Sequence, residues 1–170
     1  MNARRLMMVA VVLSVGSFTR GGAALAQEAV GLRRSTQVNC HGVLGQARDT
    51  WPGAGNVSTG VIAGFGLFDG TTQYVYDTEG FPTPDPNVVT FGAELTLTTK
   101  RGIVEARVLF LFDVVTGTWT SIATIDPHSS TGRFAGATGT LWFPSGTTVN
   151  LDGGAQAYPS YVTGHLCLAR

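Results

Sequence analysis

The feature that most constrains this chain is a pair of neighbouring segments in which apolar residues recur at every second position. In residues 89–98 the odd positions hold Val, Phe, Ala, Leu and Leu, and the even positions hold mainly Thr and Glu. Residues 103–113 hold apolar side chains at the even positions, after a Lys-Arg-Gly sequence at 100–102 that is suited to a turn. Because successive side chains point to opposite faces of a β-strand, this spacing predicts two antiparallel strands sharing one buried face.

The rest of the chain after residue 36 predicts further strands and no helix. We expect an edge strand at 37–44, strands at 61–68 and 73–76 around Asp69-Gly70, and strands at 118–125, 141–143, 147–151 and 161–168. Residues 46–59 and the proline-rich 78–87 are expected to be loops. An open sheet would have exposed strand edges, and this chain has few lysines to protect such edges from aggregation. A closed barrel has no exposed edges. We therefore predict an all-β fold: a single antiparallel, up-and-down, calycin-like β-barrel of about eight strands.

The start of the chain is typical of a secretory signal peptide. Arg4 and Arg5 precede an apolar run at 6–15, and Ala24-Leu25-Ala26 forms a small-x-small cleavage site. The apolar run is too short to span a bilayer. We expect a signal peptide at 1–26, a flexible lead-in with a short edge strand at 27–58, and the barrel domain at 59–170. The protein is expected to be secreted or periplasmic and not to span a membrane.

Charge argues against a nucleic-acid partner. Cleavage after Ala26 removes three of the eleven basic residues and leaves eight against eleven acidic ones, a net charge of −3. Nucleic-acid binding needs clustered lysine and arginine on one face. This chain has no such cluster, and its expected mature form has no net positive charge.

Cys40 and Cys167 are the two cysteines of the chain. An even pair in an exported protein predicts a disulfide. The alternative is a zinc site that adds His41 and His165. Cys40 and His41 are adjacent and would point to opposite faces of a strand, so we favour the disulfide and predict neither a metal nor another cofactor.

Aromatic side chains fall on several of the expected strands, where they would either fill a core or line a pocket. A barrel of about eight strands can hold side chains alone or one small ligand. The candidate lining residues for an apolar ligand are Tyr74, Tyr76, Phe110, Phe112, Trp119 and Phe134.

Glu94 and Arg107 are expected at the same height on the two paired strands. Inside the barrel mouth they would form a polar pair able to orient a ligand or transfer a proton. On the outer face they would form an ordinary cross-strand ion pair. We favour the second interpretation because the polar face of an amphipathic strand usually faces water.

A glycine-rich stretch late in the chain carries a resemblance to a known family. Residues 131–139 read Thr-Gly-Arg-Phe-Ala-Gly-Ala-Thr-Gly and lie between two expected strands. Glycine permits tight turns and close backbone approach, and Phe134 can plug a core. The pattern resembles bacterial secreted relatives of allene oxide cyclase and dirigent proteins. That resemblance implies an eight-stranded antiparallel barrel, often oligomeric, with an apolar cavity.

These observations favour an exported binding protein over an enzyme. We expect it to bind a small apolar molecule or to serve a structural role in the envelope. One alternative is a cyclase or isomerase acting in the barrel cavity, as in plant members of the family, whose functional residues lie outside the matching stretch. The other is an oligomeric interaction module, with a homo-oligomer as the assembly.

Overall fold

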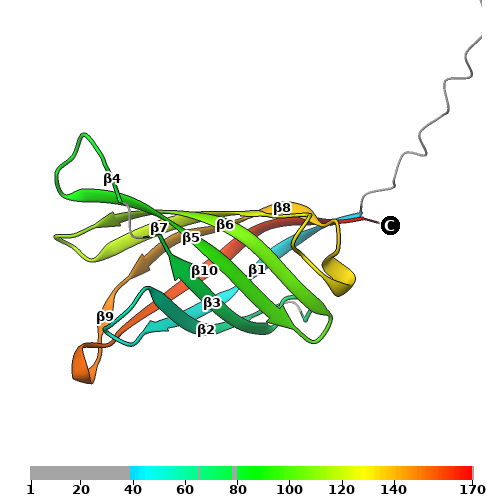
Figure 1. The fold of residues 1–170 in the computed structure, drawn as a ribbon, viewed down its shortest axis with the longest axis horizontal. Helices are drawn as coiled ribbons and strands as arrows, with labels where there is room; N and C mark the ends of the chain where they lie inside the picture. Colours follow the sequence, from blue (N-terminus) through cyan, green and yellow to red (C-terminus); the bar gives the residue numbers. More distant parts are fainter. Residues whose placement is uncertain (1–38, 65, 78–79, 170) are drawn as a thin grey trace, which may run out of the picture. The chain divides into compact units, whose positions relative to one another are not determined.

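The chain forms a closed antiparallel β-barrel (Figure 1). The computed structural model describes residues 39–169 except 65, 78 and 79; the expected signal peptide lies outside this part. The barrel strands are β1 (Asn39–Trp51), β2 (Val57–Ala63), β3 (Gly70–Tyr76), β5 (Val88–Thr99), β6 (Gly102–Asp113), β7 (Thr118–Ile125), β8 (Thr138–Thr147) and β10 (Gln156–Leu168). They follow one another around the wall, and β10 pairs with β1 to close it. The predicted all-β, up-and-down barrel is confirmed.

Four short elements complete the described chain. The strands β4 (Phe81–Pro82) and β9 (Val149–Asn150) pair with β5 and β10, respectively. Two 3₁₀ turns, η1 (Gly132–Phe134) and η2 (Asp152–Gly154), lie in the β7–β8 and β9–β10 connections.

Strand β1 is longer and more central than the edge strand expected at 37–44. It continues to Trp51, through residues for which a loop was expected, and pairs with β10 along its whole length. On its other side it pairs with β2 between Gln46 and Thr50. Its inward positions include Gly45, Ala47 and Asp49, which do not produce the apolar alternation that marks a strand in the sequence.

The β2–β3 hairpin differs from the expected one in its turn. Strand β2 ends at Ala63, so the described residues among 64–68, which were expected to continue the strand, belong to the connection with β3. The Asp69 carboxylate accepts a hydrogen bond from the Gly64 amide at 2.7 Å, which closes this turn. Asp69 is therefore a turn residue, as predicted, whereas Gly70, which was also expected in the turn, begins β3.

One end of the barrel is filled by side chains, and we call it the plugged end. Here η1 places Phe134 in the barrel interior, where it is fully buried. Its ring packs against Phe68, with the two centroids 5.8 Å apart. Gly132 makes this connection tight: its φ is +60°, and a Cβ there would meet the Arg101 carbonyl oxygen at 2.6 Å. The plug is completed by buried aliphatic residues from several strands, including Leu95, Leu97, Leu141 and Leu166.

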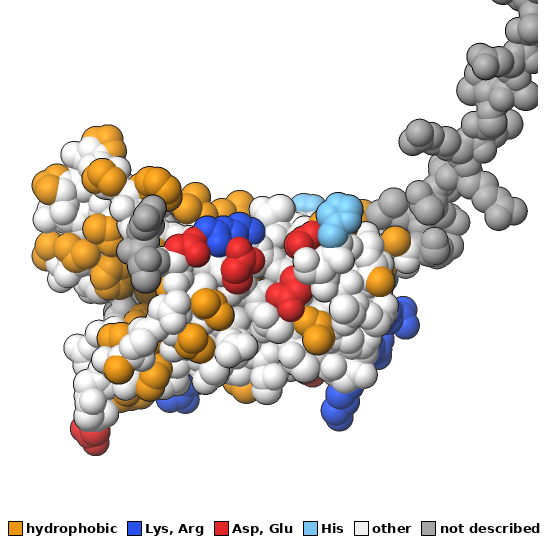
Figure 2. Space-filling model, in the orientation of Figure 1, with side chains coloured by type: hydrophobic (Ala, Val, Ile, Leu, Met, Phe, Trp, Pro, Cys, Tyr) orange, Lys and Arg blue, Asp and Glu red, His pale blue; other side chains and the backbone are white. Residues whose placement is uncertain are grey.

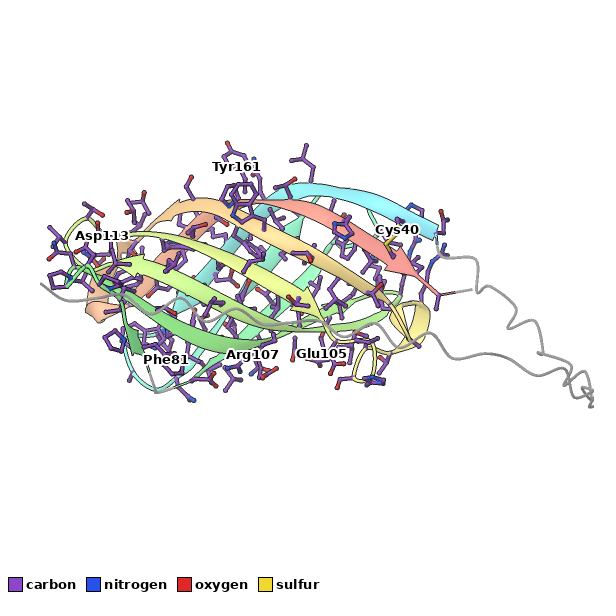
Figure 3. The ribbon with its side chains drawn as sticks, turned by 90° about the horizontal axis from the view of Figure 1, so that it is seen from above. Cys40, Phe81, Glu105, Arg107, Asp113 and Tyr161 are labelled. Atoms are coloured by element: carbon purple, nitrogen blue, oxygen red, sulfur yellow. A yellow bond between two sulfur atoms is a disulfide. The ribbon has the colours of Figure 1, made fainter. Side chains whose placement is uncertain are left out.

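The first and last barrel strands are bonded to each other at the plugged end. Cys40 and Cys167 lie directly opposite in the β1–β10 register and form a disulfide, as predicted. Cys40 is exposed and Cys167 half-buried, so the bond lies on the outer side of the wall. Figure 3 shows Cys40 at the end of the barrel opposite to Asp113, which ends β6. We call this opposite end the mouth end.

Candidate functional site

The mouth end contains a cavity of about 340 Å³. Aromatic side chains from strands around the barrel make most of its wall, and a few polar groups interrupt them. The lining residues are Asp49, Trp51, Gly55, Asn56, Tyr74, Tyr76, Asp77, Phe91, Phe110, Phe112, Trp119, Gln156 and Tyr158. Because the leucines and Phe134 fill only the plugged end, the rings at the other end surround open space.

The rings pack against one another as a continuous wall. Phe91 and Phe110 stack with centroids 5.0 Å apart, and Phe110 contacts Tyr74 and Trp119 at 6.0 and 6.1 Å. Trp119 meets Tyr158 edge-on at 6.3 Å. These are favourable aromatic separations, so each ring is held by its neighbours rather than by a ligand. The wall offers flat apolar surfaces to a bound molecule.

Asp49 brings a buried carboxyl into this apolar cavity. It points inward from β1, is only 5% exposed, and accepts a hydrogen bond from the Thr72 hydroxyl on β3. Burial raises the pKa of Asp49 to about 6, although the Thr72 hydrogen bond offsets part of that rise. The carboxyl can therefore gain or lose a proton close to neutral pH.

Two tyrosine hydroxyls share the cavity with Asp49. The Tyr76 hydroxyl is hydrogen-bonded to the Ser58 hydroxyl at 2.8 Å. Burial, and secondly the nearby Asp49 charge, hold the pKa of Tyr74 well above its usual value. Burial likewise raises the pKa of Tyr76. Both phenols therefore stay protonated in the physiological range.

The indole N–H of Trp119 is buried and has no hydrogen-bond partner among the described residues. Trp119 lies opposite Gly146 of β8, and a Cβ at Gly146 would overlap the indole ring. The glycine thus leaves room for the ring. The edge of the indole that carries this nitrogen packs against Gly146, so the N–H is covered by β8, and Trp119 contributes ring surface rather than a polar group to the cavity.

The structure brings five of the six predicted lining residues into the cavity. Tyr74, Tyr76, Phe110, Phe112 and Trp119 line it, whereas Phe134 does not, because η1 inserts it into the plugged end. The cavity wall also contains Asp49, Phe91 and Tyr158, which were not among the predicted lining residues. Asp49 lies an even number of residues from the buried Val43 and Ala47, so it faces the same side of β1. That spacing is the sequence signal that would have placed Asp49 in the interior.

Glu94 and Arg107 form an ion pair on the outer wall, not in the interior. Arg107 donates a hydrogen bond to Glu94 at 2.7 Å and another to Asp77. The Arg107 and Glu94 side chains are 53% and 61% exposed. The hydrogen bonds to Asp77 and then Glu94 raise the pKa of Arg107 above its ordinary value. The pair links the adjacent strands β5 and β6 on the outer face of the barrel, where it is exposed to solvent.

The zinc alternative loses its sulfur ligands in this structure. Cys40 and Cys167 are bonded to each other, so neither can offer a thiolate. His41 and His165 remain near this bond on β1 and β10. Within the described ranges, no three His, Cys, Asp or Glu side chains group as metal ligands.

The fold and the cavity together define a closed antiparallel barrel with an aromatic pocket open at one end. No family model matches the chain, and no curated protein matches it either. Among the residues that the structure describes, no helix combines the length and apolar character needed to cross a bilayer.

Proposed function

We propose that this protein binds a small, flat, largely apolar molecule in the cavity at the mouth end. The observation that carries the proposal is the combination, in one cavity, of an aromatic wall with a buried carboxyl, that of Asp49. Among the described residues, Thr72 is the one side chain that donates a hydrogen bond to this carboxyl. The cavity volume of about 340 Å³ falls within the range of small-molecule sites.

The polar groups indicate the chemistry of the ligand. None of the lining residues is a lysine, arginine or histidine, so the cavity offers no cation to an anionic ligand. Asp49 favours a hydroxyl or an amine, which can donate a hydrogen bond to it. The expected ligand is therefore a neutral or cationic aromatic or polycyclic compound with a hydroxyl or amine substituent.

A cyclase or isomerase acting in the same cavity is the second candidate function. Asp49 favours it, because a carboxyl with a pKa of about 6 in an apolar site is suited to general acid–base catalysis. In that reaction Asp49 would transfer a proton to or from the bound molecule while the aromatic wall holds its conformation. The resemblance to allene oxide cyclase and dirigent proteins supports the same type of barrel.

We also propose that the protein is exported. The basic, apolar and small-residue order of residues 4–26 supports a cleaved signal peptide. The Cys40–Cys167 disulfide is typical of an oxidising compartment and supports the same proposal.

Binding can be tested with the neutral fluorescent amine N-phenyl-1-naphthylamine. We expect saturable binding of one probe per chain and a loss of affinity of about tenfold in Asp49→Asn or Trp119→Phe, since the first change weakens the hydrogen bond from the probe amine and the second removes part of the aromatic surface. Trp142→Phe is the matched control, because Trp142 is an exposed tryptophan on the outer wall. Absence of saturable binding, or equal losses in Trp119→Phe and Trp142→Phe, would contradict the proposal. Circular dichroism of each variant checks that the barrel is intact.

A further inference from the structure

The loops around the cavity entrance expose large apolar side chains to solvent. We define the mouth rim as five such residues on three connections: Phe81, Val114, Val115, Val149 and Leu151. Phe81 is 65% and Val115 72% exposed. Figure 2 shows hydrophobic side chains gathered at this end of the molecule. Exposed apolar groups that cluster around an opening indicate a contact surface.

The turns at the plugged end are built differently. Among the described residues, the turns at 64–69, 100–101 and 126–137 expose no large hydrophobic side chain. They carry Lys100, Arg101 and Arg133 instead, the basic residues of the described loops. The apolar rim is thus a property of the mouth end and not of the loops in general.

The mouth loops carry acidic residues and no basic ones. Residues 52–56, 77–87, 114–117 and 148–155 contain neither lysine nor arginine. Asp85 and Asp152 lie in these loops, and Asp113 immediately precedes one, whereas Asp77 is paired with Arg107 on the wall. Hydrogen bonds from the Thr116 and Val115 amides lower the pKa of Asp113, so this carboxylate stays ionised. An anionic surface would be repelled by such an end.

We propose that the mouth rim docks on the surface of a lipid bilayer with neutral or zwitterionic headgroups, with the cavity opening toward the lipid. Rim side chains would enter the boundary between headgroups and acyl chains, where burial of apolar area favours binding. The acidic residues select against anionic lipid, the opposite of the usual polybasic preference.

A bilayer fits the rim better than a protein partner does. The five side chains lie on three separate connections, and polar residues such as Thr83, Asn87 and Thr116 stand between them in the sequence. A fluid lipid surface can accommodate separate apolar tips, whereas a protein interface needs matching shape. The rim also surrounds the entrance of an apolar cavity. A molecule dissolved in the bilayer could therefore enter that cavity without passing through water.

Vesicle co-sedimentation of the mature protein tests this surface directly. We expect binding to phosphatidylcholine vesicles, and weaker binding when part of that lipid is replaced by phosphatidylglycerol at low salt. Added salt should reduce the difference, since it screens the repulsion between charged lipid and the acidic residues. The double variant Val114→Ser/Val115→Ser should lose about tenfold in vesicle affinity, because it removes apolar contact area.

The matched control is Leu44→Ser/Val61→Ser, which changes two exposed aliphatic residues on the side wall of the barrel. This control should bind vesicles like the unaltered protein. The docking surface does not depend on the proposed ligand, so the naphthylamine probe provides a separate check that the cavity of each variant is intact. The proposal is overturned by unchanged vesicle binding in the rim variant, by a preference for anionic vesicles, or by a dimer that the rim variant dissociates.

Discussion

Asp49 links the stability of the barrel to pH. Its pKa is about 6 in the folded protein, against 3.8 for an ordinary aspartate. Between these values the folded state holds more protons than the unfolded state, so stability falls as the pH rises from about 4 to about 6. Below about pH 4 both states are protonated, and above about pH 6 the full cost of a buried negative charge is present.

The variant Asp49→Asn should remove this pH dependence. Asparagine is close in shape and cannot ionise, so we expect it to exceed the unaltered protein in stability by about 1–3 kcal/mol above pH 6. At pH 4 the two proteins should be nearly equal. Thermal unfolding from about pH 4 to about pH 7 measures the difference. Parallel stability curves across that range would show that Asp49 is not the titrating group.

Strands differ in how clearly their sequences reveal them, and β1 and β6 are the two extremes. The inward side of β6 holds Val104, Ala106 and Val108 in an uninterrupted alternation, and the prediction placed this strand at its observed bounds to within one residue. Strand β1 turns glycine, alanine and aspartate inward, so residues 46–51 had no apolar contrast and were expected to form a loop. The inward polar residue Asp49 thus interrupts the apolar alternation by which this strand would have been recognised.

The cavity was predictable only in part for a related reason. The strand pattern identified Phe110, Phe112 and Trp119 as inward side chains. Which end of the barrel they occupy depends on η1, because that turn decides where Phe134 fills the interior. Sequence alternation gives the face of a residue and says nothing about its height along the barrel.

The disulfide between β1 and β10 should stabilise the barrel without being needed for its fold. Cys40→Ser/Cys167→Ser replaces two side chains on the outer face of the wall. The bond joins residues 127 apart in sequence, so its loss frees a long loop in the unfolded chain. We expect a loss of roughly 2–4 kcal/mol in the free energy of unfolding. Urea unfolding measures the loss, and an unfolded double variant at room temperature would contradict the expectation.

The barrel that the structure describes has two unlike ends, joined by one continuous wall. The plugged end has a filled interior, basic turns and the disulfide, and the mouth end has the cavity, acidic loops and the apolar rim. Figure 3 shows Phe81 toward the mouth end and Cys40 at the other. Such polarity is suited to a protein that binds through one end only.

The proposed export would determine where the mature protein begins. The order of residues in 4–26 predicts cleavage between Ala26 and Gln27. We expect protein recovered from the periplasm or the medium to begin at Gln27. N-terminal sequencing or intact mass checks this, and a chain that retains Met1 would show that no such cleavage occurs.

The disulfide also closes the chain between Cys40 and Cys167 into a covalent ring that contains nearly all of the barrel, because Cys40 lies near the start of the first strand and Cys167 near the end of the last. One backbone cut by a protease in a mouth loop would open that ring into a linear molecule without releasing a fragment. The two halves would migrate as one species on a gel until a reductant is added. The exposed loops around the cavity can therefore be nicked while the barrel remains a single covalent molecule.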